Sequence, residues 1–100
     1  MASITIKTST SKRRDTLRGL VQTALYREKE NLQLALTRTR DELARFEKRH
    51  RLTSAKFYRS YQSGKLDDRN DFIDWAGEYQ IYLLLREQIA SLRGLKIDHR

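Results

Sequence analysis

The feature that most limits how this chain can fold is the near absence of residues that interrupt a helix. Its 100 residues contain no proline and only four glycines, and helix-favouring residues such as Leu, Arg, Glu and Ala are frequent. Between about residues 12 and 51 the one glycine is Gly19, which costs a helix about 1 kcal/mol. We therefore predict an all-α chain of one domain that begins with a long helix over about residues 12–51.

Apolar side chains recur along this helix at the spacing of a coiled-coil seam. From residue 32 to residue 46 the seam positions are separated by alternating steps of four and three residues, with Thr39 as the one polar residue among them. A helix of about 40 residues is roughly 60 Å long, which exceeds the diameter of a compact domain of this size. The seam therefore needs cover from another helix or another chain, and we predict a homo-oligomer. Its members are Leu25, Leu32, Leu36, Leu43 and Phe46.

Two shorter helices are predicted in the remaining chain, over about residues 54–63 and residues 70–93. Thr53 occupies an N-cap position, and Gly64 stands where a helix is expected to end in a left-handed residue. The last helix carries a broad apolar face, which indicates burial on more than one side. We expect the two shorter helices to fold as a hairpin against the C-terminal end of the long helix.

The first residues of the chain give a different signal. Residues 3–8 alternate apolar and polar side chains, with β-branched types that are typical of a strand. No second strand pattern follows, and a lone strand leaves its backbone groups unpaired. Residues 1–11 are therefore predicted to be either a strand that pairs with another chain or a disordered basic tail, ahead of a helical domain over residues 12–100.

Positive charge is concentrated at this end of the chain. The formal net charge is +8, and the first 14 residues contribute +4 of it. If the long helix begins near residue 12, three of these cations lie in its first turn and oppose the helix macrodipole. Either they contact nucleic-acid phosphates or an acidic partner, or they are solvated and the helix starts nearer Asp15. The four cations are Lys7, Lys12, Arg13 and Arg14.

Seven aromatic residues fall in the C-terminal half of the chain, where such side chains build cores and interfaces. Most of them lie on the apolar stripes of the two shorter helices, so we expect them in the core. Tyr58 and Tyr82 point off those stripes and are the better interface candidates. The full set is Phe57, Tyr58, Tyr61, Phe72, Trp75, Tyr79 and Tyr82.

The usual constellations of catalytic and metal-binding residues are missing. There is no cysteine, no phosphate-binding glycine loop and no serine elbow. His50 and His99 lack partners at metal-ligand spacing. The aspartates of residues 67–74 are explained by helix capping, with Asp68 or Asn70 as the cap of the last helix. We expect no enzyme, no metal site and no cofactor.

The location of the protein is predicted from two further observations. The longest unbroken apolar run, residues 81–85, is far shorter than a membrane-spanning helix. The lack of cysteine fits a reducing compartment. We expect a cytoplasmic protein that does not enter a membrane.

The C-terminal half also resembles a known group of proteins. Residues 52–58 (Leu-Thr-Ser-Ala-Lys-Phe-Tyr), 63–68 (Ser-Gly-Lys-Leu-Asp-Asp) and 71–76 (Asp-Phe-Ile-Asp-Trp-Ala) form an ordered series of motifs within about residues 52–85. This series resembles small prokaryotic helical proteins identified as the antitoxins of two-gene toxin–antitoxin pairs, although Asp74 replaces a Glu of the pattern. The resemblance implies a protein that binds and neutralises a toxin-like partner, and it carries over no catalytic residue.

The sequence supports three hypotheses about function. The first is an antitoxin-like interaction protein that acts through helical surfaces. The second is a nucleic-acid-associated protein or transcriptional regulator that uses the basic N-terminal residues, whose binding would weaken steeply with salt. The third is a structural coiled-coil oligomer built on the seam of the long helix.

Overall fold

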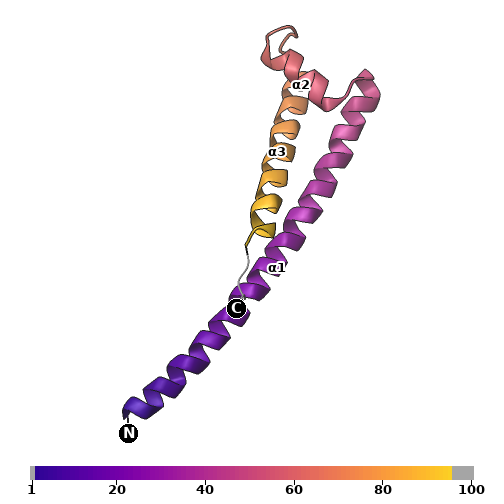
Figure 1. Ribbon diagram of the computed structural model, residues 1–100. Helices are drawn as coiled ribbons and strands as arrows, with labels where there is room; N and C mark the ends of the chain where they lie inside the picture. Colours follow the sequence, from indigo (N-terminus) through magenta and orange to yellow (C-terminus); the bar gives the residue numbers. More distant parts are fainter. Residues whose placement is uncertain (1, 96–100) are drawn as a thin grey trace.

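The structure of the protein is a computed structural model that describes residues 2–95, with the side chains of residues 10–95. It contains three helices, α1 (Ala2–His50), α2 (Ser54–Gln62) and α3 (Asn70–Arg93). Helix α3 runs back along the C-terminal half of α1, and α2 lies across the end where the two meet (Figure 1). The prediction of an all-α chain with one long helix is confirmed, and the expected hairpin does fold onto the end of the long helix.

The N-terminal end of the chain differs from the prediction. Helix α1 begins at Ala2 instead of near residue 12, so residues 3–8 continue the helix and form neither the predicted strand nor a separate tail. A continuing helix pairs each backbone N–H with the carbonyl four residues earlier, whereas a lone strand pairs none within its own segment. The backbone hydrogen bonds gained in the helix outweigh the preference of these alternating side chains for a strand.

The early start of α1 also removes the conflict between the N-terminal cations and the helix dipole. Lys12, Arg13 and Arg14 lie about three turns from the first residue of α1. The field of the dipole falls off within the first turn of a helix. The opposition expected for a helix that begins near residue 12 therefore does not arise, and the cations are exposed on the side of a continuous helix.

Two apolar clusters hold α3 and α2 against α1. From here on, the hairpin means α3 together with the C-terminal half of α1 that it covers. Leu32 and Leu36 of α1 pack against Leu85 and Ile89 of α3 in the first cluster. In the second, Leu43 of α1 packs with three side chains of the shorter helices, of which Trp75 is fully buried. The predicted seam is therefore covered along this half of α1 by α3 of the same chain. The three side chains are Phe57, Trp75 and Ala76.

Trp75 is the centre of the second cluster. Its ring stacks on Phe57 with 3.8 Å between centroids and an interplanar angle of 4°. Phe46 and His50 stack near it at 5.6 Å and 5.2 Å. The indole nitrogen donates a hydrogen bond of 2.9 Å to the hydroxyl of Ser54, so the polar edge of this buried ring is satisfied.

The turn between α1 and α2 uses side chains from both helices. Arg51 has a φ of 52°, in the left-handed region that reverses the chain after α1. Thr53 is the N-cap of α2, as predicted, and its hydroxyl accepts a bond of 3.3 Å from the N–H of Lys56. The carboxylate of Glu47 accepts a second bond, of 2.8 Å, from the N–H of Ser54. Helix α1 thereby helps to cap α2.

The end of α2 follows the predicted pattern. Gly64 has a φ of 77°. Its N–H donates to the carbonyl of Tyr61, and the N–H of Lys65 donates to the carbonyl of Ser60 at 3.1 Å. This pair of bonds is a Schellman motif, which requires a left-handed residue at the position of the glycine.

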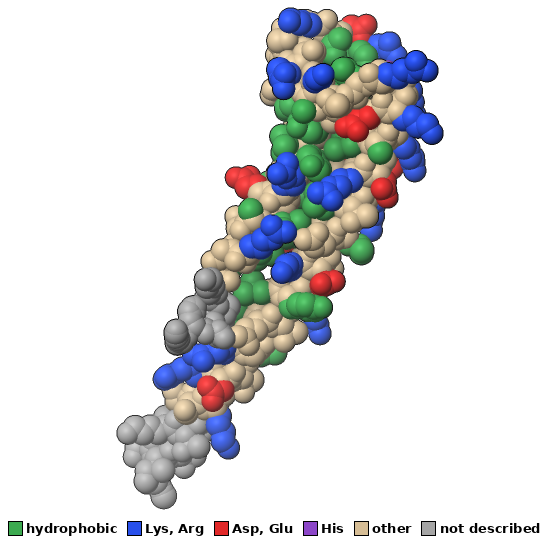
Figure 2. Space-filling model, turned by 45° about the vertical axis from the view of Figure 1, so that its right-hand side comes forward, with side chains coloured by type: hydrophobic (Ala, Val, Ile, Leu, Met, Phe, Trp, Pro, Cys, Tyr) green, Lys and Arg blue, Asp and Glu red, His purple; other side chains and the backbone are tan. Residues whose placement is uncertain are grey.

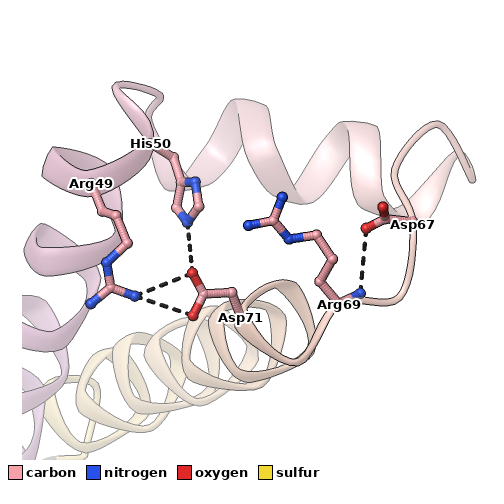
Figure 3. A network of polar contacts seen from close by, with 5 residues as sticks. All are labelled: Arg49, His50, Asp67, Arg69 and Asp71. Carbon is pink, nitrogen blue, oxygen red and sulfur yellow. Dashed lines mark hydrogen bonds and ion pairs between the residues drawn. The ribbon is translucent and has the colours of Figure 1, made fainter.

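A polar cluster joins the end of α1 to the start of α3 (Figure 3). Asp71 accepts a hydrogen bond of 3.1 Å from Arg49 and shares one of 3.0 Å with His50. The bond with His50 and the bond from Arg49 hold the pKa of Asp71 below its ordinary value of 3.8. Because Asp71 is also in the first turn of α3, its negative charge suits the dipole of that helix.

The predicted N-cap of α3 was wrong. The N-cap is Arg69, which makes no side-chain cap bond, so neither Asp68 nor Asn70 fills that role. Asp67 instead accepts a bond of 3.4 Å from the N–H of Arg69. The aspartate two residues ahead of the cap therefore orders the entry to the helix.

Among the described residues, no helix combines the length and the apolar character that crossing a membrane requires.

Candidate functional site

A groove with a basic rim runs along one side of the hairpin, between α1 and α3. Its upper part, next to α2, encloses about 490 Å³, and its lower part encloses about 410 Å³. Arg40 and Arg86 line both parts, and Arg93 lines the lower one. We call this the basic groove. It also contains Leu36, Leu43, Tyr79, Tyr82 and Ile89, together with one carboxylate, Glu47, which accepts the hydrogen bond from the N–H of Ser54.

Helical spacing explains why the basic residues of this groove come together. On α3, Tyr79, Arg86 and Arg93 are seven residues apart, so they form one line along the helix. On α1, Arg40 lies seven residues before Glu47 and therefore on the same line. The apolar residues between the two lines belong to the seam, so the groove has an apolar floor and charged walls.

The arginines of the basic groove are available to a partner. Within residues 10–95, Arg40, Arg86 and Arg93 form no ion pair with a carboxylate. The guanidinium of Arg86 lies 5.6 Å from the ring centroid of Tyr82, a cation–π contact that orients it. Figure 2 shows Lys and Arg side chains along the hairpin, with apolar side chains between them and fewer Asp and Glu. Such a surface suits a ligand that carries carboxylates or phosphates.

A second groove, on the other side of the hairpin, has the opposite charge. It consists of two separate depressions of about 370 Å³ and 460 Å³ that share no lining residue and follow one another along the hairpin. Asp74, Ile81, Gln88 and Leu95 line them at intervals of seven residues, so both depressions lie on one face of α3. We call this the acidic groove. Its carboxylates are Glu28, Glu42, Asp74, Glu78 and Glu87.

The N-terminal half of α1 lies beyond both grooves. Helix α1 extends past the end of α3 (Figure 1), and we call its residues 10–27 the arm. The predicted contact residues Lys12, Arg13 and Arg14 lie exposed on the arm, while the side chain of Lys7 lies outside the described residues. Their predicted role in binding nucleic acid or an acidic partner stays a prediction.

The predicted seam residues do not share one environment. Leu32, Leu36 and Leu43 are buried under α3. Phe46 is half-buried beside Trp75 and forms part of the acidic groove. Leu25 is half-buried at the end of the arm. The seam is therefore largely the core of the hairpin.

Phe57 and Trp75 are fully buried, and the assignment of Tyr58 and Tyr82 to an interface stays a prediction. Tyr58 and Tyr82 are half-buried, as are Tyr61, Phe72 and Tyr79. The hydroxyl of Tyr58 accepts a bond of 2.9 Å from Gln80, and its ring lies 5.1 Å from that of Tyr79. Tyr58 is therefore tied into the hairpin, and Tyr82 is the tyrosine that lines a groove together with Tyr79.

Sequence reasoning missed the arginines of the basic groove. It weighted the dense cations at the N-terminus, whereas Arg40, Arg86 and Arg93 are scattered through the last two thirds of the chain. The available signal was the position of each arginine beside the apolar stripe, at intervals of seven residues on α3. This spacing predicts a shared groove only when the antiparallel pairing of α1 and α3 is known.

The described residues do not offer a metal site. No group of three or more His, Cys, Asp or Glu side chains within that part of the chain is placed to hold an ion. His50 is committed to Asp71 and to its stacking on Trp75.

Comparison with models of protein families, with curated proteins and with solved structures finds no match for this chain. The motifs behind the resemblance to antitoxins are structural in this fold, because Phe57, Gly64, Asp71 and Trp75 build the corner around α2. The resemblance stays a prediction.

Proposed function

We propose that this protein is a non-catalytic binding protein, antitoxin-like, that captures and neutralises a partner protein by holding an acidic segment of it in the basic groove. The observation that carries the proposal is the set of three arginines, Arg40, Arg86 and Arg93, on one apolar-floored groove without carboxylate partners in residues 10–95. Arginine forms bidentate bonds to carboxylates, and Tyr and Arg dominate the energetics of many interfaces.

The shape of the groove favours an extended or helical segment as the ligand. The two parts follow one another along the hairpin and share Arg40 and Arg86. A partner helix with apolar residues at every third or fourth position could lie on the floor, with its acidic residues toward the arginines. The proposal places this encounter in the cytoplasm, and it applies to a partner encoded beside this protein, as in the pairs that the sequence resembles.

The test is coexpression with the products of the adjacent genes. We expect one of these gene products to arrest growth when it is expressed alone and to form a stable complex with this protein. Coexpression of this protein should relieve the growth arrest. The double variant R40E/R86E should weaken the complex at least tenfold, because it replaces two attractive charges by two repulsive ones. The matched control R38E/R59E makes the same charge change at exposed positions outside the grooves and should bind normally.

Two results would contradict the proposal. One is that no adjacent gene product forms a complex. The other is that the complex forms equally well with R40E/R86E and with the control variant. Arg40 and Arg86 are exposed, so the hairpin should stay folded in R40E/R86E, and circular dichroism of both variants checks this.

A specific observation favours nucleic-acid binding as a second candidate function. Lys12, Arg13, Arg14 and Arg18 are exposed within seven residues of the arm, with Asp15 as the one acidic residue among them. Replacing Lys12, Arg13 and Arg14 by Gln should abolish binding to duplex DNA that weakens steeply with salt. Binding that ignores both salt and these substitutions rejects this candidate.

A further inference from the structure

The arm presents an apolar stripe that the described part of the chain leaves uncovered. Leu17, Leu20 and Val21 are 54%, 61% and 44% exposed. Every described residue from 10 to 24 is exposed, and Leu25 is the first that is half-buried. A stripe of this length on a single helix is unusual, because an isolated helix is marginally stable in water without a packed face.

The uncovered stripe lies in phase with the seam that α3 covers. Val21 and Leu25 precede Leu32 by 11 and 7 residues, which are close to three and two whole turns of helix. Val21 and Leu25 therefore point in the same direction as the covered seam, whereas Leu20, 12 residues before Leu32, lies about a third of a turn away from that direction. A segment that covers the arm would therefore lie on the same side of α1 as α3 does along the rest of that helix.

A second line of residues on α1 lies beside the seam. Leu17, Ala24, Ala35 and Glu42 follow one another along it at intervals of 7, 11 and 7 residues. On the hairpin this line borders the acidic groove, to which Glu42 contributes. On the arm the same side of α1 carries Leu17 and Ala24, and both are exposed.

Length restricts what the second neighbour can be. Helix α3 has 24 residues and covers about half of the 49 residues of α1. The uncovered half is thus about as long as the covered half. Two copies placed side by side in opposite directions would put the arm of each against the hairpin of the other over the full length of the molecule, about 74 Å.

Charge selects the side of the hairpin on which the arm would lie. The arm carries five cations and one anion in residues 10–27. The acidic groove has five carboxylates, of which Glu42 pairs with Arg45 at 3.6 Å, and no Lys or Arg is among its described lining residues. Its apolar floor contains Leu32, Phe46, Ile81, Leu92 and Leu95. An arm with Leu17 and Val21 on one side and arginines at the edges matches this groove in both respects.

We propose that the acidic groove binds the arm of a second copy of this chain, and that the protein is a two-fold symmetric antiparallel dimer. Each half of the dimer is then a three-helix bundle made of the arm of one copy and the α1–α3 hairpin of the other. The contact is isologous, so it closes at two copies. Pairing of arm with arm is disfavoured, because it brings two strongly basic segments together.

The basic groove lies on the opposite side of the hairpin and stays open in this dimer. Partner capture in the basic groove and dimerisation through the acidic groove therefore use different residues. Failure of one proposal leaves the other standing, and the variants that test them do not overlap.

The first test is the mass in solution by sedimentation equilibrium. We expect twice the chain mass of 11.9 kDa for the natural sequence and one chain mass for the variant L17D/V21D, whose charges would face the acidic groove. The control Q22D/Y26D adds the same two charges at exposed positions of the arm that lie away from Leu17, Leu20 and Val21, and it should remain a dimer. A monomer at every concentration overturns the proposal, as does dissociation of the control to the same extent.

A matched pair on α3 tests the groove itself. Ile81 lines the acidic groove, whereas Leu84 is about equally exposed and lines neither groove. I81D should weaken the dimer at least tenfold and L84D should leave it intact. If both variants behave alike, the arm of the second copy does not lie in the acidic groove.

The relative orientation of the two copies is tested by cross-linking introduced cysteines, because the natural sequence contains none. In a fully overlapping antiparallel pair, residue 10 of one copy lies near residue 42 of the other. The variant T10C/E42C should form a dimer with a short bismaleimide, because its two thiols are about 48 Å apart within one helix. Either single variant should give no cross-linked product. Efficient cross-linking of the single variants would show a parallel dimer and contradict the proposal.

Discussion

The two halves of α1 carry the same kind of apolar stripe and lie in different surroundings. In the half that α3 covers, Leu32, Leu36 and Leu43 are between 5% and 8% exposed. In the arm, Leu17, Leu20 and Val21 are between 44% and 61% exposed. The difference shows that an amphipathic pattern fixes which side of a helix is to be buried and leaves open which chain buries it.

The largest expected effect is in the covered half, at Trp75. Replacing it with Ala removes the ring that stacks on Phe57, and it leaves a cavity at the corner of the hairpin. We expect a loss of about 3–5 kcal/mol in the free energy of unfolding, measured by urea denaturation followed by circular dichroism. A loss below about 1 kcal/mol would show that this cluster does not hold α2 and α3 on α1.

A paired substitution sharpens the comparison between the two halves. At protein concentrations low enough to favour single chains, Leu43→Ala should cost about 2–5 kcal/mol, since its side chain is buried against Phe57 and Trp75. Leu17→Ala should change the stability by less than about 0.5 kcal/mol under the same conditions. Equal losses would mean that the arm is packed within a single chain.

The cap of α2 should contribute less than the core. Thr53→Ala removes the bond to the N–H of Lys56 and should cost about 1 kcal/mol, measured by thermal denaturation. Thr53→Ser keeps the hydroxyl and is the control. No difference between the two variants would show that Glu47 alone caps this helix.

The smallest effect is expected at Asp71, whose ion pairs lie near the surface. Because its pKa is lower in the folded chain than the ordinary 3.8, its contribution to stability is fully present above that pH and is lost as the pH falls through the folded value. Asp71→Asn should therefore be less stable than the natural chain at neutral pH, and the gap should close on acidification. Urea denaturation across this pH range measures it, and a gap that widens in acid contradicts the assignment.

Local signals account for the parts of the fold that the sequence predicted well. Thr53 and Gly64 mark the two ends of α2 because capping depends on neighbouring residues. The seam at Leu32, Leu36 and Leu43 follows from helical periodicity alone. Both kinds of signal are contained within a few turns of chain, so a single sequence displays them.

The parts that the sequence did not predict depend on long-range pairing or on the balance of weak local signals. The bonds of Asp71 to Arg49 and His50 join residues more than 20 positions apart. Each groove takes its charge from two antiparallel helices, so Arg40 and Arg86 become neighbours only after α3 has folded back. The left-handed Arg51 carries no Gly or Asn signal, and residues 3–8 resemble a strand although they continue a helix.

Amide hydrogen exchange of the arm and of the hairpin, measured as a function of protein concentration, tests most directly how the two halves of α1 are covered. We expect amides of residues 32–46 to be protected at every concentration, because α3 of the same chain covers them. Amides of residues 10–24 should gain protection only as the concentration rises and two copies associate. Arm protection that is independent of concentration, or hairpin protection that is lost on dilution, would contradict the claim that one half of α1 is covered from within and the other by a second copy.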